Sequence, residues 1–336
     1  MNTKRKIKVR YVLLLLLIVV LSLAMSSVDS AYTVRVIDLA LIYSICAFGL
    51  LLMLGMGGQL VYSSVAFMGI GAYTAANLCS GRLGFYMDSG LVLILAILAG
   101  GLVAFLFGLP LLRLKGTFFT FATIGIVQIL YTFFLNYKPL FGGPAGISGI
   151  KTMTLFGIEF NDYYKWFYFL IVLVIAVMLI LSRARNSQFG RRLAAIRDNE
   201  IAAQVLGVNI YWTRVKAFTI SGMLGGLSGA LLAMLAKYIG ADNFSYARAS
   251  TFIIMAMLGG VNSAPGIILG SVIVTALPEV LRGMDQYLMF IYGVAVILLM
   301  ILMPMGIFGL GSDISKRIRK RLSVRRHVGA AVPPKE

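Results

Sequence analysis

Long apolar runs alternate along this chain with short polar segments that are rich in Gly, Pro, Lys and Arg. A helix needs about 20 apolar residues to cross the hydrocarbon core of a bilayer, and many of these runs approach that length. The pattern therefore predicts an all-α fold, a polytopic transmembrane helical bundle. Its spans are expected at residues 11–25, 37–54, 61–78, 91–112, 118–135, 167–181, 215–236 and 287–303.

One further apolar run, residues 251–282, is longer than a single span needs and is interrupted by Gly and Pro at 259–266. A single helix there would give nine crossings and would place the two basic ends of the chain on opposite sides of the membrane. Because Lys and Arg mark the cytoplasmic side, we expect both termini in the cytoplasm and an even number of crossings. We predict two short half-helices that meet at 259–266, as a re-entrant hairpin or as two tilted spans, and about ten spans in all.

The composition leaves no room for a separate soluble domain. Apolar residues make up 60% of the 336 residues and charged residues only 12%, whereas about 25% of the residues of a globular domain are charged. We divide the chain into a basic cytoplasmic N-terminus at 1–10, a membrane domain at 11–310 and a basic cytoplasmic tail at 311–336. The first 30 residues have the layout of a secretory signal, but we expect the first helix to be retained because everything after it is also membrane.

The net charge of +18 reflects membrane topology rather than nucleic-acid binding. Most of the 30 Lys and Arg residues lie in the first ten positions, in the segment 182–216 and after residue 311. Basic segments of this kind face the cytoplasmic leaflet, where anionic lipid headgroups attract them. Membrane lipid is therefore an expected partner and nucleic acid is not.

The segment 182–216 is the longest polar interruption, and its basic residues place it in the cytoplasm. Apolar residues at helical spacing predict one or two amphipathic helices that begin near Ser187 and end at Gly207. These apolar residues are Phe189, Leu193, Ile196, Ala203 and Leu206. Two interpretations are open: a solvated connector whose apolar face rests on the bilayer surface, or a docking helix for a soluble partner.

Glycine is concentrated in three other segments. Residues 136–165 form the longest expected external loop, and the turn-forming residues at 141–149 predict a defined turn rather than a flexible tether. Glycine at 55–60 and at 259–266 predicts breaks within apolar runs. Because broken backbone at membrane depth is tolerated only where protein or a water-filled cavity covers it, these two breaks are candidate linings of a translocation path.

Motifs for catalysis are missing from the sequence. It contains no GxxxxGK[ST] phosphate loop, no HExxH pair and no CxxC motif, so neither nucleotide hydrolysis nor a metal or other cofactor is expected in this chain. Cys46 and Cys79 lie in apolar runs and indicate no disulfide framework. A membrane enzyme that acts on lipid would need a polar cluster at one membrane face, and no such group of carboxylates or histidines is visible.

The sequence offers few charges to couple transport to an ion gradient. Asp38, Lys237 and Glu279 are expected near span ends rather than at span centres, where a proton-coupled carrier keeps its charged residues. An uphill transporter of this kind takes its energy from a partner. A passive channel needs no energy source and stays an alternative, with polar residues that could line it at Gln59, Asn77, Thr120, Thr123 and Gln128.

Five ordered blocks of sequence, within residues 39–310, resemble one family. They are GMGGQLVYSSVAFMGIGAYTAA, KGTFFTFATIGIVQIL, FGGPAGISGI, FGRRLAAIRDNEIAAQVLGVNIYWTRVKAFTISGMLGGLSGAL and MLGGVNSAPGIILGSVIVTALPEVLR. Together they resemble the permeases of bacterial branched-chain amino acid ABC importers, of the LivM type. The resemblance implies a multi-pass protein of the bacterial inner membrane that moves Leu, Ile or Val. It also implies the partners: separate ABC ATPase subunits, a second homologous permease subunit and a soluble periplasmic substrate-binding protein.

The chain departs from this family at two places near the expected path. Many relatives have Gly-His where this chain has Tyr62, Ser63 and Ser64, and a bulkier run than VNSAPG after Gly260. These differences leave the substrate open, because permeases for urea, short amides and sugars share the general scaffold. A related importer for urea, short amides or another small polar solute is therefore a second expectation.

The resemblance also implies which residues couple transport to ATP hydrolysis. The segment 183–213 is similar to the cytoplasmic loop that seats against the ATPase subunits, and its matching residues are Gly190, Arg191, Ala194, Arg197, Asp198, Glu200, Ala202, Ala203 and Gly207. We expect Arg191 and Arg197 to contact acidic groups of the ATPase, and Ala194, Ala202 and Ala203 to allow close backbone approach. The residues expected along the translocation path are Gly57, Gly58, Gln59, Gln128, Gly259, Gly260 and Asn262.

Overall fold

The computed structural model describes residues 31–82, 86–114, 116–155 and 157–280, together with residues 290, 291, 293, 294 and 297. The predicted span at 11–25, most of the span at 287–303 and both basic termini lie outside the described residues. Over the described part the chain is mostly helical, as the apolar pattern predicts.

In the described part of the chain five helices are long and apolar enough to cross a membrane. They are α2 (Ala31–Leu50) with its continuation η1 (Leu51–Met56), α4 (Ser89–Leu111), α5 (Thr117–Asn136), α7 (Tyr163–Asn186) and α10 (Ile210–Ala236). Three apolar helices are shorter, namely α3 (Ser64–Cys79), α11 (Tyr246–Gly259) and α12 (Ala264–Val280). Each lies where the sequence predicts a span or half-helix, so the predicted helical membrane bundle is confirmed.

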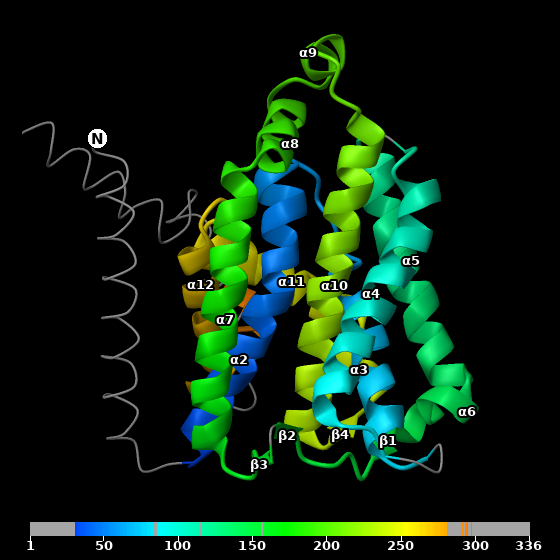
Figure 1. The fold of residues 1–336 in the computed structure, drawn as a ribbon, viewed down its shortest axis with the longest axis vertical. Coiled ribbons are helices and arrows are strands. Elements are labelled where there is room, and N and C mark those ends of the chain that lie inside the picture. Colours follow the sequence, from blue (N-terminus) through cyan, green and yellow to red (C-terminus); the bar gives the residue numbers. More distant parts are fainter. Residues whose placement is uncertain are drawn as a thin grey trace, which may run out of the picture.

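The bundle has two distinct ends. Two short helices, α8 (Gln188–Asp198) and α9 (Glu200–Val205), stand at one end, at the top of Figure 1. The other end carries α6 (Lys138–Phe141), η2 (Gly143–Ala145), η3 (Ala241–Phe244) and four two-residue strands, β1 (Ile147–Ser148), β2 (Thr154–Leu155), β3 (Ile158–Glu159) and β4 (Tyr238–Ile239). β1 pairs antiparallel with β4, and β2 with β3. The segment 136–165 is therefore ordered, as its turn residues predict, although the all-α prediction omitted these strands.

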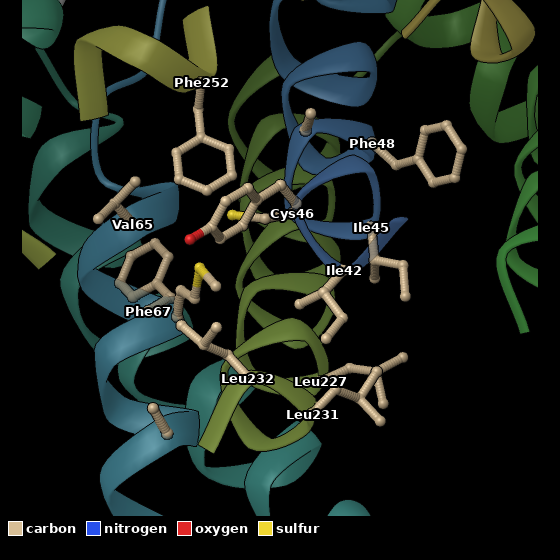
Figure 2. Packing of buried hydrophobic residues seen from close by; sticks show 14 of the residues in the cluster. Ile42, Ile45, Cys46, Phe48, Val65, Phe67, Leu227, Leu231, Leu232 and Phe252 are labelled. Atoms are coloured by element: carbon tan, nitrogen blue, oxygen red, sulfur yellow. The ribbon is translucent and has the colours of Figure 1, made fainter. Parts of the chain in front are cut away.

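Helix α10 is the centre of the bundle and packs against α2, α3 and α4. Small residues allow this close packing, because a Cβ atom on Gly71 would overlap the backbone of Gly226. Larger side chains fill the spaces between the helices, and Figure 2 shows Ile42 and Ile45 of α2 beside Leu227 and Leu231 of α10.

We expect Gly71→Ala to lower the free energy of unfolding of the bundle by about 1–3 kcal/mol, since the added methyl group must push α3 away from α10. Thermal melting of the detergent-solubilised chain measures this effect. Gly125→Ala in α5 is the matched control, because a Cβ atom there meets no other atom within 4 Å. Equal melting of the two variants would show that α3 and α10 do not need this close contact.

The chain between η1 and α3 is not helical. Residues 57–63 run back into the bundle, and α3 begins beside the middle of α10, where Ser64 Oγ lies 3.4 Å from Ser221 Oγ. Hydroxyl groups of α5 satisfy the exposed backbone: Thr120 donates to the carbonyl of Leu60, and Thr123 accepts from the N–H of Tyr62, both at 3.3 Å. The predicted break is confirmed, and both threonines form hydrogen bonds with its backbone groups.

Helices α11 and α12 form the predicted pair of half-helices. Their turn is built on Gly260, whose φ of 103° favours glycine, and Ser263 accepts from the N–H of Gly266 at 3.3 Å. Gly259 packs directly on the backbone of Gly266, so the end of α11 and the start of α12 are in very close contact. The first half-helix begins at Tyr246, five residues before the predicted start of this apolar run.

Asp38 is a correction to the sequence-based expectation. Helix α2 begins at Ala31, so Asp38 lies two turns inside the helix rather than at its end, and the residue is fully buried. Neither carboxyl oxygen has a hydrogen-bond partner in the described part of the chain. The sequence starts the predicted span at residue 37 because Arg35 interrupts the apolar run. The helix in fact continues through Arg35 back to Ala31, which places Asp38 in its interior.

Candidate functional site

The segment between α7 and α10 begins with a tight turn. Ser187 is the N-cap of α8, and its Oγ accepts from the N–H of Gly190 at 3.4 Å. Gly190 is buried against the last carbonyls of α7, where a Cβ atom would overlap the carbonyl oxygens of Ala184 and Arg185. The predicted start near Ser187 is confirmed, and Gly190 is required because α8 folds back so closely on α7.

The apolar face of α8 packs on this chain itself. Leu193 and Ile196 are both buried, while Arg191 and Arg192 are exposed and the Arg197 side chain is 37% exposed. Ala194 is half-buried. The apolar face of α8 therefore neither rests on the bilayer surface nor is free for a soluble partner.

Helix α9 is the part of the segment that presents apolar side chains to the outside. Asn199 breaks the chain between α8 and α9 and caps α9, since its Oδ1 accepts from the N–H of Ala202 at 3.0 Å. Ile201 is 76% exposed, Val205 82% and Leu206 81%. We call these three residues the apolar knuckle; Figure 1 shows α9 at the tip of the molecule.

The C-terminal end of α9 has the predicted left-handed glycine. Gly207 has a φ of 79°, and the N–H of Val208 donates to the carbonyl of Ala203 at 3.0 Å. Ala203 is buried, whereas Ala202 is exposed beside the apolar knuckle. Leu206 was expected on the same face as Leu193 and Ile196, and the structure places it on the opposite, exposed side.

An ion pair fixes α9 to the long helix α10. The guanidinium of Arg214 donates to both carboxylate oxygens of Glu200, at 3.1 and 2.9 Å. The Arg214 side chain is only 10% exposed and that of Glu200 is 41% exposed. Because a two-pronged pair of this kind restricts orientation as well as distance, α9 and the start of α10 form one unit.

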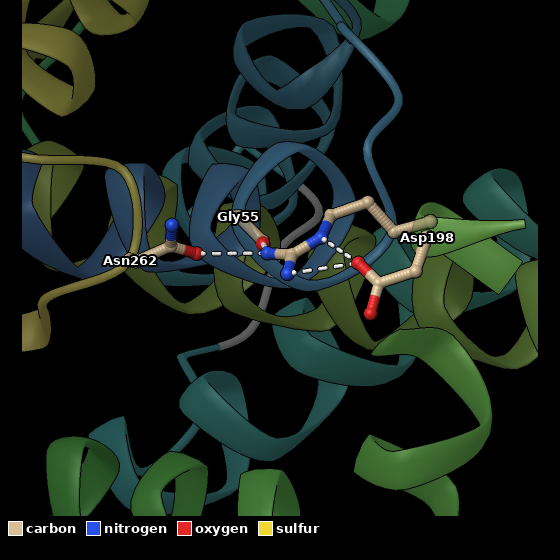
Figure 3. Close-up of polar contacts among 4 residues, drawn as sticks. Gly55, Asp198 and Asn262 are labelled. Carbon is tan, nitrogen blue, oxygen red and sulfur yellow. Dashed lines mark hydrogen bonds and ion pairs between the residues drawn. The ribbon is translucent and has the colours of Figure 1, made fainter. Parts of the chain in front are cut away.

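Arg197 connects α8 to both glycine breaks, as Figure 3 shows. Its Nη1 donates to the carbonyl of Gly55 at 2.7 Å and to Oδ1 of Asn262 at 3.3 Å. Its Nε and Nη2 donate to Oδ1 of Asp198 at 3.3 and 3.2 Å. Arg185 adds a bond of 2.7 Å from its Nη1 to the carbonyl of Asn262. We call this group of Arg185, Arg197, Gly55 and Asn262 the arginine clamp.

Glycine is also required where the aliphatic part of the Arg197 side chain crosses the first break. Gly58 has a φ of 68°, and a Cβ atom there would lie 2.6 Å from Cγ of Arg197. Gly57 ends η1, with its N–H bonded to the carbonyl of Leu52 at 3.0 Å. One predicted coupling residue, Arg197, therefore meets two predicted path residues, Gly58 and Asn262, although they are far apart in the sequence.

Some predicted site residues lie outside this group. Gln128 is exposed on α5, away from the arginine clamp. Arg191 donates only to the carbonyl of Asn186, at 2.7 Å, among the described contacts. Gln59 has a buried Oε1 with no hydrogen-bond partner in the part of the chain that the structure describes.

The sequence did not single out Arg185, Gly55 or Arg214. Arg185 and Arg214 are two of several arginines in a basic segment, and no spacing rule separates them from the rest. Gly55 contributes a backbone carbonyl, which carries no sequence signal. Among the described residues no group of three or more His, Cys, Asp and Glu side chains is placed to hold a metal ion.

Comparison with known proteins gives consistent matches. Residues 32–304 match the family described as the permease component of the branched-chain amino acid transport system. The chain is 32% identical over 323 residues to the high-affinity branched-chain amino acid transport system permease protein LivM of Escherichia coli (strain K12), covering 89% of this chain and 75% of that protein. The LivM protein of Salmonella typhimurium is 31% identical over the same shares.

A more distant match is the autoinducer 2 import system permease protein LsrC of Salmonella typhi, which is 27% identical over 67% of this chain and 63% of that protein. No solved structure matches the chain.

Proposed function

The chain belongs to the family of permease components of branched-chain amino acid transport systems, and from this premise we propose that it carries leucine, isoleucine or valine across the bacterial inner membrane. As the multi-pass permease of an ABC system, it is not itself catalytic and works with ATPase and binding-protein partners. A second homologous permease subunit completes the proposed assembly. The finding that carries this proposal is the match to LivM over 89% of the chain.

The apolar knuckle is the proposed docking site for an ATPase subunit. Three large apolar side chains exposed on one short helix at the tip of a bundle are typical of a protein interface rather than of a free surface. The exposed Ala202 beside them allows close approach of a partner. The basic α8 next to the knuckle favours a cytoplasmic location for this end, and we propose that both termini lie on the same side.

The attachment of α9 suggests how ATPase movement reaches the membrane. Because Glu200 is paired with Arg214, a force on α9 moves the start of α10 with it. The arginine clamp then links α8 to the breaks at Gly55–Gly58 and Gly260–Asn262. We assign the inner end of the translocation path to these breaks, with Gly57, Gly58, Gln59, Gly259, Gly260 and Asn262 along it. The exposed Gln128 on α5 fits a path that continues between two permease subunits.

The direct test is leucine uptake into proteoliposomes that contain this chain with its ATPase subunits, the second permease and the binding protein. We expect uptake only when ATP is present on the side of the membrane that carries the ATPase subunits. A non-hydrolysable ATP analogue should support no uptake. Uptake of leucine by this chain without nucleotide would show a passive channel instead. ATP-driven uptake of urea or a short amide, but not of leucine, would show the related importer.

A further inference from the structure

A small polar cavity lies at the end of the bundle opposite α9. It has a volume of about 180 Å³ and is bounded by the starts of α2 and α7 and the end of α10. Arg35, Asn161 and Lys237 supply its polar lining, and Phe160, Trp166 and Leu235 supply apolar walls. Three membrane-crossing helices therefore contribute to one cavity at the level where they leave the apolar region.

The cavity is built for negative charge. Two of its lining residues, Arg35 and Lys237, are cations, and no lining residue is acidic. Among the described residues neither cation forms an ion pair. The acids near these lining residues in the sequence are engaged or buried elsewhere. Glu159 accepts from Nδ2 of Asn161 at 2.9 Å, Asp162 lies 4.0 Å from Nζ of Lys165, and Asp242 accepts from the hydroxyl of Tyr131 at 3.0 Å. Asp38, three residues after Arg35 in α2, is fully buried and lies outside the cavity lining.

The backbone conformation of Lys237 is an independent indication that this lining residue has a function. Lys237 follows the end of α10 with a φ of 58° and is the one non-glycine residue with a positive φ in the described part of the chain. Glycine or asparagine normally occupies this left-handed position, because a Cβ atom is unfavourable there. A non-glycine residue in this conformation costs about 1 kcal/mol or more, which is consistent with a function for the Lys237 side chain.

The cavity lies beside the start of α7, a helix long and apolar enough to cross a membrane, whose first turns carry the exposed Tyr164 and Tyr168. Trp166 lines it and donates from Nε1 to the carbonyl of Phe160 at 2.9 Å, and Tyr163 lies at the start of the same helix. Tyr and Trp are enriched where headgroups meet the hydrocarbon core. Phosphate groups of lipids lie at the same depth, beside apolar walls that suit the glycerol region.

We propose that this cavity binds the phosphate of an anionic phospholipid in the leaflet at the end opposite α9. The Arg35 guanidinium offers a fork of donors to two phosphate oxygens, and the Lys237 ammonium supplies a point charge from the far wall. The bound headgroup would join the ends of α2, α7 and α10. This site is separate from the apolar knuckle and does not depend on which substrate is transported.

Native mass spectrometry of the full chain, titrated with phosphatidylglycerol in detergent, tests the proposal. We expect Arg35→Gln or Lys237→Gln alone to weaken binding about fivefold, and the double variant about thirtyfold. Lys138→Gln is the matched control, because Lys138 is an exposed lysine of α6 at the same end but outside the cavity. The control should bind phosphatidylglycerol as the unchanged chain does.

Lys237→Gly separates lipid binding from folding. Glycine removes the charge and also relieves the left-handed backbone, so the variant should melt at the same or a higher temperature while its phosphatidylglycerol binding falls about fivefold. Unchanged binding in the double variant would overturn the proposal. If that variant, in detergent without added lipid, also no longer responds to the binding protein, the cavity receives an acidic side chain of that protein instead.

Discussion

A chain that carries Ile201→Asp and Val205→Asp is expected to lose its complex with the ATPase subunits, and ATP-driven uptake with it. Both side chains are more than three-quarters exposed, so the substitutions remove no packing within this chain. Burial of a large aliphatic side chain in an interface contributes roughly 1.5–3 kcal/mol, and a carboxylate in its place must also be desolvated. Two such changes in one small contact should weaken the complex by about a hundredfold or more.

Co-purification with the ATPase subunits and uptake into proteoliposomes measure this loss. Ile158→Asp is the matched control, because Ile158 is 56% exposed in β3 at the opposite end of the molecule. We expect the control to assemble and transport normally, and both proteins to melt at the same temperature. Ala202→Trp should act in the same direction by blocking close approach. A double variant that keeps its ATPase subunits would exclude the knuckle as the docking site.

The sequence predicts the membrane helices well because their signal is local. A run of apolar residues is enough to specify a span, and glycine-rich interruptions are enough to predict the breaks before α3 and between α11 and α12. The same argument misses Asp38, because a single carboxyl group hardly changes the mean hydropathy of α2. Strands β1 and β4 are missed for another reason, because β4 lies about ninety residues further along the chain than β1.

The apolar knuckle shows why helical spacing is insufficient at the functional site. Phe189, Leu193, Ile196, Ala203 and Leu206 recur at helical spacing, which predicts one or two helices but does not show where a second helix would begin. The break at Asn199 starts a new helix with a new phase and turns Leu206 outward together with Ile201 and Val205. A one-residue interruption of this kind has no strong signal, because asparagine is also found within helices.

The arginine clamp depends on contacts between distant parts of the chain. Arg197 and Gly55 are 142 residues apart, and Arg197 and Asn262 are 65 residues apart. The sequence identifies each of the three segments but not that they meet, and it assigns Arg197 to the surface that faces the ATPase. The bonds of Arg197 within the chain favour a different role, as the connection between the docking segment and the breaks.

Arg197→Ala is therefore expected to lower uptake at least about tenfold while leaving the ATPase subunits bound. The variant loses the bonds to Gly55 and Asn262 that join α8 to both breaks, whereas the apolar knuckle and the Glu200–Arg214 pair stay intact. ATP hydrolysis should continue but should drive transport less efficiently, so that at least about tenfold more ATP is consumed for each leucine taken up. A tenfold change corresponds to about 1.4 kcal/mol of coupling, close to the lower limit of the roughly 1.5–3 kcal/mol that a hydrogen bond from a charged group contributes.

Three further variants decide whether the clamp transmits the movement. Arg192→Ala removes a neighbouring exposed arginine that is not among the predicted coupling residues and has no contact with either break among the described residues, and it should transport normally. Asn262→Ala should resemble Arg197→Ala, because it removes the Oδ1 acceptor at the second break. Arg197→Lys should restore only part of the coupling, since one ammonium group cannot reproduce the planar fork of the guanidinium. If Arg197→Ala instead releases the ATPase subunits as completely as the knuckle variant does, Arg197 contacts the ATPase directly and does not act through the breaks.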